Sequence, residues 1–330
     1  MGYKLTIGTR SSKLAIWQAN YIRDELLKLS KHTGLLLPEI VLKEIKTKGD
    51  HITDVALSKI GDKGLFTREI EDALLAKEID LAVHSLKDLP TKLPDGLKLG
   101  AVLKREKPHD VLIVGRSVAC NASTFVTLPA KSKIGTSSLR RIAQLKALRN
   151  DLEYLDLRGN LDTRIRKLEE GSYDAIILAY AGVKRLGLED KITEHFNPKD
   201  ILPAVGQGAL AIEIRQDDKN IENIVSKLNH NETYLASMAE RAFLEILQGG
   251  CQVPIGAYSE IKDGQIILYG LVASLDGKKN IKDKNTGNLK INECKLVGEN
   301  LAKTLLQMGA KEILQEIFIE MPNRGVSMGV

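Results

Sequence analysis

Two stretches of the chain repeat one pattern of apolar and polar positions. Residues 4–22 (KLTIGTRSSKLAIWQANYI) and 131–148 (KSKIGTSSLRRIAQLKAL) each begin with a short β-rich run, pass through Ile-Gly-Thr and serines, and continue with apolar residues at helical spacing. The pattern predicts a strand, a polar turn and an amphipathic helix in both stretches. The apolar positions expected to share a face are Leu14, Trp17, Ala19, Tyr21 and Ile22 in the first helix and Ile142, Leu145 and Leu148 in the second.

A second pair of stretches, 78–90 (EIDLAVHSLKDLP) and 173–187 (YDAIILAYAGVKRLG), runs from an apolar strand into a loop and basic residues. The strands at 81–83 and 175–178 are apolar throughout, which is typical of parallel strands buried on both faces. Helices alternate with strands in both halves, so we expect two α/β lobes with mostly parallel sheets. Polar residues follow the strands, and the ligands of such sheets bind beyond the carboxyl ends of the strands.

The chain beyond about residue 230 follows a different pattern, which predicts a small α+β domain. Its expected elements are a helix at 232–248, a loop that carries Cys251, strands at 257–261 and 265–274, a Lys/Asn-rich loop at 277–290 and a helix at about 296–317. The segment 202–215 is expected to cross back to the first lobe. The predicted domains are lobe 1 at 1–105 and 206–227, lobe 2 at 106–205, and the α+β domain at 228–330.

Composition narrows the function classes only in part. The 330 residues carry a net charge of +5, and aromatic residues make up only 4%, which argues against a base-stacking surface for single-stranded nucleic acid. Three cysteines, Cys120, Cys251 and Cys294, without a CxxC motif favour a reducing compartment. We find no apolar signal core, no run as long as a membrane span and no metal-ligand spacing of histidines, so we expect a cytoplasmic protein without a metal.

Residues 135–138 (GTSS) open a predicted helix and form a candidate anion site, because free backbone N–H groups and the helix dipole favour negative charge there. Arginines gather near the predicted strand ends, where guanidinium groups would bind a ligand with several carboxylates or phosphates. These are Arg10, Arg140, Arg141, Arg158, Arg164 and Arg185, whereas Arg149, Arg166 and Lys184 are expected to be solvated surface residues.

Asp88 follows a buried strand and stands next to Lys87. A carboxylate among cations is well placed to stabilise a cationic intermediate and to pass protons. An aspartate before Leu-Pro also suits an N-cap or a turn, and the residues alone leave both interpretations open. We expect His84 to be a hydrogen-bonded packing residue rather than a base.

Two loops carry further candidates. The segment 47–66 combines glycines and charges with little apolar pattern, which fits a mobile lid as well as an ordinary solvated loop. Cys251 in LQGGCQVPIG stands on a Gly-Gly tip rather than inside an apolar run. Most cysteines are inert small apolar residues, but a thiol that faces a basic site is activated as a nucleophile. No Cys/His/Asn arrangement indicates a protease, so the thiol is a candidate for holding a group covalently.

Eight motifs in one order resemble the porphobilinogen deaminase family, also called hydroxymethylbilane synthases, from about residue 4 to 320. They are GTRSSKLA, GDKGLF, DLAVHSLKDLP, GTSSLRR, LRGN, YDAIILAYAGVKRLGL, LPAVGQGAL and GGCQVPIG. The resemblance implies a transferase of tetrapyrrole and heme biosynthesis. Such an enzyme joins four porphobilinogen molecules head to tail, with loss of ammonia, onto a dipyrromethane cofactor and releases hydroxymethylbilane by hydrolysis.

The resemblance also implies two lobes like those of periplasmic binding proteins, a third domain and a monomer. It assigns the thioether attachment of the dipyrromethane to Cys251 and the catalytic role to Asp88, and it implies no metal. The implied cofactor ligands are Ser85, Lys87, Thr136, Ser138, Arg140, Arg141, Arg158 and Arg164. The implied substrate ligands are Arg10, Ser12, Arg158, Arg164 and Arg185, and the implied lid residues are Asp50, Lys59 and Lys63.

The sequence departs from the family at a few places. Lys48 stands where the family usually has arginine, which matters if that residue makes a bidentate contact. The segments 116–130 and 277–290 match poorly and receive no function, and the tail 321–330 is expected to be disordered.

Two other classes of function stay open at this point. A two-lobe architecture also suits a non-catalytic anion receptor or the effector domain of a regulator, since fold does not determine function. A receptor has no need of the cysteine tip, and no export signal or DNA-binding helix pair is evident. Nucleic-acid binding through the basic residues would show a steep salt dependence, but these residues lie on separate loops rather than on one stripe.

Overall fold

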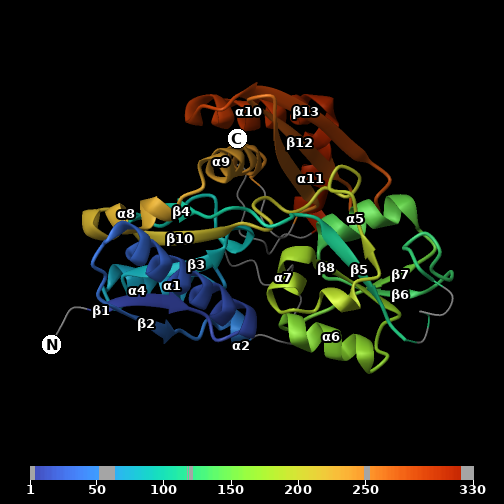
Figure 1. Cartoon of the computed structure of the whole chain (residues 1–330). Coiled ribbons are helices and arrows are strands. Elements are labelled where there is room, and N and C mark those ends of the chain that lie inside the picture. The colour runs from blue at the N-terminus through green and yellow to red at the C-terminus, as the bar shows by residue number, and fades with distance from the viewer. Residues whose placement is uncertain (1–3, 52–63, 117, 119–121, 249–252, 321–330) are drawn as a thin grey trace. The chain divides into compact units, whose positions relative to one another are not determined.

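The computed structural model describes residues 4–51, 64–116, 118, 122–248 and 253–320 (Figure 1). These residues form two compact units. Unit 1 contains the described residues of 1–52, 63–106 and 208–234, and unit 2 contains those of 107–207 and 235–330. The three predicted domains with boundaries near 105, 205 and 227 stay a prediction.

Unit 1 is built on a sheet whose described strands run in the order β2-β1-β3-β10-β4. β1 (Lys4–Thr9) pairs in parallel with β2 (Glu39–Glu44) and with β3 (Leu81–Ser85). β10 (Leu210–Arg215) runs antiparallel to both β3 and β4 (Leu97–Val102). The predicted return of the chain after residue 202 is confirmed, because β10 lies inside this sheet.

Helices cover both faces of this sheet. α1 (Lys13–Thr33) begins at Ser12, whose side chain accepts a hydrogen bond from the Ala15 N–H, and it ends at Gly34 with φ of 69°. α1 shares a core with one face of the strands, while α4 (Arg68–Leu75) packs against Ala82, which points to the opposite face. The other described helices of unit 1 are α2 (Lys48–His51), η1 (Leu86–Asp88), α8 (Lys219–Val225) and η3 (Ser226–Leu228).

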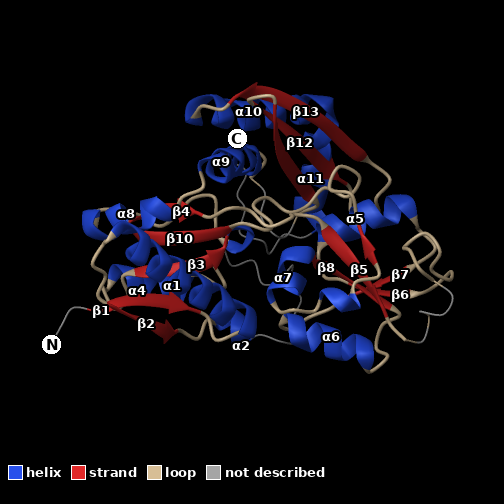
Figure 2. Ribbon diagram, viewed as in Figure 1, coloured by secondary structure: helices blue, strands red, loops and turns tan. Residues whose placement is uncertain are grey.

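The sheet of unit 2 has the same pattern of strand directions, with described strands in the order β7-β6-β8-β5-β9 (Figure 2). β6 (Lys133–Gly135) pairs in parallel with β7 (Glu153–Leu155) and β8 (Ala175–Ala179). β5 (Asp110–Val114) is antiparallel to β8 and β9 (Glu194–His195). In both sheets, therefore, the one strand that runs against the others occupies the fourth position.

The helices of this part of unit 2 are α5 (Leu139–Leu148), α6 (Leu161–Glu169), α7 (Tyr180–Arg185) and η2 (Glu189–Lys191). α5 begins at Ser138, whose hydroxyl accepts a hydrogen bond from the Arg141 N–H at 3.4 Å. Apolar residues of β8 alternate between two cores, because Ile177 packs with Leu145 of α5 and Ile176 packs with Ile165 of α6.

The remaining residues of unit 2 form an antiparallel sheet and three helices around their own core. The strands are β11 (Ile255–Lys262), β12 (Gln265–Ala273) and β13 (Asn280–Asn288), and the helices are α9 (Asn231–Ile246), α10 (Ile291–Leu305) and α11 (Lys311–Glu320). The predicted fold class is confirmed: two α/β sheets with mostly parallel strands, and an α+β carboxyl-terminal part.

The predicted loop at 277–290 was wrong, because most of it is strand β13, which pairs with β12 along its whole length. Apart from Ile281 and Gly287 its residues are polar, and they alternate between exposed and half-buried, so the apolar alternation that marks a strand is missing. The final helix, predicted as one element at about 296–317, is interrupted. A π-helical turn at Leu306–Ala310, with Gly309 at φ of 109°, separates α10 from α11.

The predicted apolar faces of two helices need correction. In α1 the buried residues are Gln18, Ala19, Ile22 and Leu26, whereas Trp17 and Tyr21 are 37% and 38% exposed. These two rings stack on each other with their centroids 5.3 Å apart, because positions four apart are neighbours on a helix. In α5, Leu145 is buried as expected, but Leu148 at the helix end is exposed.

Candidate functional site

A pocket in unit 1 lies where β1 leads into α1, where α4 begins and where β3 ends. It is lined by Arg10, Ser12, Leu14, Ala15, Gln18, Phe66, Thr67, Val83, His84, Ser85 and Asp88. The structure thus brings together four of the predicted site residues, namely Arg10, Ser12, Ser85 and Asp88. Lys87 is half-buried and is not among the residues that line the pocket.

The turn that carries Asp88 is anchored on both sides. The Leu86 N–H donates to the Ala209 carbonyl at 3.0 Å, and the Leu89 N–H donates back to the Leu86 carbonyl at 3.2 Å. Leu86 itself is buried. Asp88 is exposed, and within the described part of the chain its carboxylate makes no hydrogen bond or ion pair. The alternative interpretation, in which this carboxylate caps the turn, therefore finds no support in the geometry.

Two contacts in this pocket were not predicted from the sequence. The Gln18 side-chain amide donates to the Ser85 hydroxyl at 2.8 Å, and Gln18 is 3% exposed. A buried polar side chain needs a partner, so a glutamine on the apolar face of the first predicted helix was the available signal. The guanidinium of Arg10 lies 4.3 Å from the centroid of the Phe66 ring, a cation–π contact that orients it.

In unit 2 the predicted pair Arg140 and Arg141 lies around Asp110, which the sequence did not single out. Arg140 Nη1 is 2.9 Å from Asp110 Oδ2, and Arg141 Nη2 is 2.7 Å from Asp110 Oδ1. All three side chains are buried. Burial alone would raise the pKa of Asp110, but the two guanidinium groups and their hydrogen bonds hold it well below its usual range.

Backbone and amide groups complete this cluster. Arg140 donates to the Leu202 carbonyl at 2.7 Å, and Arg141 donates to the Ile177 carbonyl at 2.9 Å. The Gln207 side chain adds a hydrogen bond to Asp110 Oδ1 at 2.8 Å. Two positive charges face one negative charge, so this cluster keeps a net charge of one positive unit.

Thr136 and Ser138 lie at the start of α5 as predicted. The Ser138 N–H donates to the Thr136 hydroxyl at 3.3 Å, and Thr136 is buried. The intervening Ser137 hydroxyl donates to the Leu157 carbonyl and accepts from the Leu157 N–H, both at 3.0 Å. Ser137 therefore ties the start of α5 to the loop that carries Arg158.

Arg158 has unused hydrogen-bonding capacity. Its Nε and Nη2 atoms are buried, and they make no hydrogen bond with any described residue. Burial lowers the pKa of this guanidinium, while Asp156 opposes the shift. Because a buried donor without an acceptor is costly, this arrangement favours an anion at Arg158.

The other predicted basic residues differ in their surroundings. Arg164 donates to the Gly159 carbonyl at 2.8 Å, and Arg185 is in the last turn of α7. Arg166 and Lys184 are exposed, as expected. Arg149 was wrongly expected to be solvated: its guanidinium binds Asp151 and the carbonyls of Val126 and Leu128.

Several predicted residues lie outside the described part of the structure. They are Cys251, Cys120, Lys59, Lys63, the side chain of Asp50 and the tail 321–330. At the start of the predicted lid 47–66, the Lys48 N–H donates to Glu69 Oε1 at 3.0 Å. Cys294 is buried, and burial raises the pKa of its thiol.

His84 is the hydrogen-bonded packing residue that the sequence predicted. Its Nε2 lies 3.0 Å from Glu213 Oε2, and both side chains are buried. Among the described residues, no three or more His, Cys, Asp or Glu side chains form a group that could hold a metal. Among the same residues, no helix is long and apolar enough to cross a membrane.

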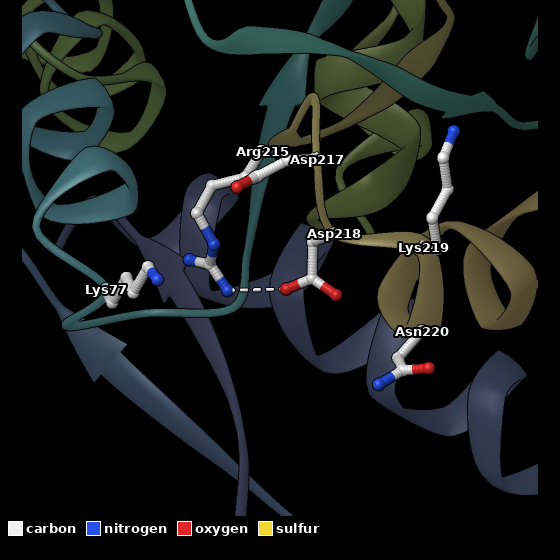
Figure 3. Close-up of a pocket in the computed structure, with 6 residues that line it drawn as sticks. All are labelled: Lys77, Arg215, Asp217, Asp218, Lys219 and Asn220. Atoms are coloured by element: carbon white, nitrogen blue, oxygen red, sulfur yellow. Dashed lines mark hydrogen bonds and ion pairs between the residues drawn. The ribbon is translucent and has the colours of Figure 1, made fainter.

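A second hollow in unit 1 is lined by Lys77, Arg215, Asp217, Asp218, Lys219 and Asn220 (Figure 3). Arg215 Nη2 donates to Asp218 at 2.7 Å, and its Nη1 donates to the carbonyls of Leu74 and Ile79. The buried guanidinium thus ties β10 to the last turn of α4 and to the segment after it, so we interpret this hollow as structural.

Solved structures with low identity are similar to this chain. An ancestral arginine-binding protein bound to arginine has 12% identity and a TM-score of 0.37, with 69% of this chain and 91% of that protein covered. A putative periplasmic sulfonate-binding protein SsuA from Methylobacillus flagellatus has 15% identity and a TM-score of 0.37, with 74% of this chain and 68% of that protein covered.

Two family models cover most of the chain. Residues 5–223 match "Porphobilinogen deaminase, dipyromethane cofactor binding domain" and residues 234–307 match "Porphobilinogen deaminase, C-terminal domain". The porphobilinogen deaminase of Carboxydothermus hydrogenoformans is 54% identical over 319 residues, which cover 96% of this chain and 98% of that protein. The porphobilinogen deaminase of Syntrophomonas wolfei is 51% identical over 314 residues, which cover 94% of this chain and 98% of that protein. The resemblance of the eight motifs is confirmed, and the chain belongs to the porphobilinogen deaminase family.

Proposed function

We propose that this chain carries out the reaction of its family. It joins four porphobilinogen molecules head to tail with loss of ammonia, on a covalently bound dipyrromethane, and releases hydroxymethylbilane by hydrolysis. It is thus a transferase of tetrapyrrole and heme biosynthesis. The observation that carries this proposal is the family match over residues 5–223 and 234–307, which includes Asp88 and Cys251.

The residues of unit 2 fit a cofactor that bears several carboxylates. The buried Nε and Nη2 atoms of Arg158 need acceptors, and the cluster around Asp110 keeps a net positive charge. The proposed ligands are Ser85, Lys87, Thr136, Ser138, Arg140, Arg141, Arg158 and Arg164, with Cys251 as the point of attachment. When bound, the cofactor supplies the pyrrole end from which the product is built.

Asp88 is the proposed catalytic residue. As ammonia leaves porphobilinogen, positive charge develops on the substrate, and a nearby carboxylate stabilises it. The same carboxylate accepts and returns a proton during the reaction. Asp88 suits this role because it is exposed in a pocket on an anchored turn, and within the described residues its carboxylate has no ion pair that would compete.

Arg10, Ser12 and Arg185 are the proposed ligands of substrate carboxylates, with Arg158 and Arg164 shared. Guanidinium groups bind carboxylates bidentately, and the Phe66 ring holds the Arg10 guanidinium in place. Asp50, Lys59 and Lys63 are the proposed lid residues. We also propose that the enzyme is a cytoplasmic monomer, and light scattering during size-exclusion chromatography tests the oligomeric state.

The intact mass of the purified protein, compared with that of Cys251→Ser, tests the cofactor. We expect an excess of two linked pyrrole units on the wild type and none on the variant. If the wild type is bare, porphobilinogen is added, and an enzyme should then gain mass in steps of one pyrrole unit. A chain that stays bare even then would exclude the enzyme and favour an anion receptor.

The rate of porphobilinogen consumption by Asp88→Asn, at unchanged cofactor content, tests the catalytic residue. Loss of a group that acts in general acid–base catalysis should lower kcat by about 100-fold or more. The matched control is Asp95→Asn, which makes the same change at an exposed aspartate of the same unit and should leave turnover unchanged. Wild-type turnover by Asp88→Asn would contradict this assignment.

A further inference from the structure

A group of buried polar side chains lies beside the Asp88 pocket in unit 1. Glu71 of α4, His84 of β3 and Glu213 of β10 are 5%, 6% and 0% exposed, and Thr67 at the start of α4 is also buried. The strand register places Glu213 opposite Ala82 and Ala211 opposite His84. Residues two apart on a strand, and residues opposite each other on paired strands, point to the same face, so the side chains of His84 and Glu213 lie on one face of the sheet. This is the face that α4 covers.

The cluster has fewer donors than acceptors. His84 Nε2 lies within hydrogen-bond distance of Glu213 Oε2, but the other oxygen of Glu213 is buried and has no partner among the described residues. Glu71 Oε1 is in the same situation. The Thr67 hydroxyl, which is also buried and has no partner among the described residues, can donate to one of these atoms. Two ionised carboxylates would still leave the other atom as an unsatisfied acceptor, which is costly in a protein interior. One proton on Glu71 makes it a donor and removes a buried negative charge.

The surroundings of Glu71 favour its neutral form over its ionised form. Burial raises the pKa of Glu71, and the charges of Glu213 and Asp72 add to the rise, while the Thr67 hydroxyl and His84 oppose it. His84 comes from β3 and Glu213 from β10, the two central strands beneath α4, and Asp72 is the exposed neighbour on α4 itself.

The cations on the surrounding strands are engaged elsewhere. Arg215 of β10 binds Asp218 and two backbone carbonyls. Lys98 of β4 pairs with Glu222, and Lys4 of β1 pairs with Glu39. Arg10, which follows β1, lies over the Phe66 ring. None of these contacts brings a positive charge to Glu71.

The cluster is continuous with the proposed catalytic pocket. His84 and Thr67 belong to the cluster and also line the pocket that contains Asp88. His84 directly precedes Ser85, and the turn that carries Asp88 begins at the next residue, Leu86. A shift of His84 is therefore transmitted to Ser85 and Asp88 over a few covalent bonds.

We propose that Glu71 is protonated beneath the Asp88 pocket and is a positioning residue, which completes the hydrogen bonds of Glu213 and thereby holds His84 and the Ser85–Asp88 turn in place. This inference rests on the proposed role of Asp88. Ionisation of Glu71 puts a second negative charge under a pocket that must bind substrate carboxylates. Substrate binding then weakens, and the turn loses its support.

Infrared difference spectroscopy of the cofactor-loaded enzyme tests the proton directly. Glu71→Gln removes the carboxyl but keeps an uncharged side chain of the same size that can donate a hydrogen bond. We expect the wild type to show the carbonyl band of a protonated buried carboxyl at neutral pH, and Glu71→Gln to lack it. The band should remain in Asp72→Asn, which changes an exposed carboxylate one residue away. The same spectrum for the wild type and Glu71→Gln would overturn the proposal.

The dependence of kcat and KM on pH tests the positioning role. We expect the KM of the wild type for porphobilinogen to rise at alkaline pH and the rise to be lost in Glu71→Gln, because the amide does not ionise. Glu71→Ala, which removes the donor, should lower kcat/KM about tenfold, the scale of one hydrogen bond to a charged group. A purely structural role would lower stability in both variants and leave the alkaline limb of the profile unchanged.

Asp88→Asn separates the two proposals. If Asp88→Asn is inactive while Glu71→Gln keeps the wild-type profile, the proposed site stands and this inference fails. If Asp88→Asn is fully active, the proposed site fails, and the infrared band alone decides whether Glu71 is protonated. The intact mass of each variant shows whether the cofactor is loaded, so loss of activity through loss of cofactor is recognised.

Discussion

Asp110 and Arg141 form a buried ion pair with Arg141 Nη2 2.7 Å from Asp110 Oδ1. The pair joins the first strand of the second α/β sheet to the helix that opens with Gly-Thr-Ser-Ser. Its carboxylate also faces Arg140, so one aspartate orients both arginines that the sequence predicted as ligands. The two arginines therefore approach any ligand as a braced pair rather than as flexible surface side chains.

Asp110→Asn should destabilise the protein by about 3–5 kcal/mol, because it leaves two buried guanidinium groups without their counter-charge. Urea unfolding measures the loss. Glu169→Gln, which breaks an exposed pair with Lys191 in the same unit, should change stability only slightly. If both variants lose the same small amount, the Asp110 cluster is not the brace that we describe.

The same cluster predicts how stability responds to acid. The pKa of Asp110 is lower in the folded state than in the unfolded state, so the ion pairs contribute fully above the ordinary carboxyl range of about pH 4. Their contribution is lost as the pH falls below that range through the folded-state pKa. Unfolding free energies measured between pH 6 and about pH 2 should therefore decline less steeply in Asp110→Asn than in the wild type.

The raised pKa of Glu71 predicts the opposite dependence of stability on pH. Its pKa is raised in the folded state, so its contribution is complete below the ordinary glutamate value of about 4.3 and is lost as the pH rises through the folded-state pKa. The stability of Glu71→Gln relative to the wild type should thus improve steadily toward alkaline pH. Urea midpoints at several pH values test this, and a constant difference would show that Glu71 does not change its protonation on unfolding.

The buried, unpartnered nitrogen atoms of Arg158 predict that this residue lowers stability in the absence of the cofactor but helps to bind the cofactor. Arg158→Met removes two buried donors that lack acceptors, so in a cofactor-free Cys251→Ser background it should leave stability unchanged or raise it. With Cys251 intact, the same change should lower the fraction of loaded protein seen by intact mass. Arg158→Lys keeps a positive charge without the planar fork and should give an intermediate loaded fraction. Full loading of Arg158→Met would refute a ligand role.

Gln18 predicts a specific effect on the pocket. Gln18→Leu keeps the volume of the side chain but removes the hydrogen bond to the Ser85 hydroxyl, so kcat/KM for porphobilinogen should fall about tenfold. The control is Asn20→Ala on the same helix, since within the described residues the Asn20 side chain bonds only to the Ile16 carbonyl of its own helix. Equal activities of the two variants would mean that Gln18 serves packing alone.

Local patterns were enough to predict most of the α/β elements. The apolar runs that became β3 and β8, and the Ile-Gly-Thr segments before α1 and α5, carry their signal in neighbouring residues, because periodicity and helix caps are properties of short stretches. The order of the motifs was likewise enough to identify the family. Strand β13 was not predicted, because a mostly polar edge strand gains its stability from pairing with β12 rather than from an alternation of apolar residues.

The tertiary structure alone decided which polar residues meet. Asp110 lies 30 residues before Arg140 along the chain, and Glu213 lies 129 residues after His84, yet each pair is in contact. No local pattern specifies such pairs, because they form only when sheet register and helix docking bring distant positions together. The sequence by itself determined the elements, the family and the kinds of residue at the site. Burial and register decided that Arg140 and Arg141 are braced by Asp110, that Gln18 supports Ser85, and that His84 and Glu213 meet on the face of the sheet that α4 covers.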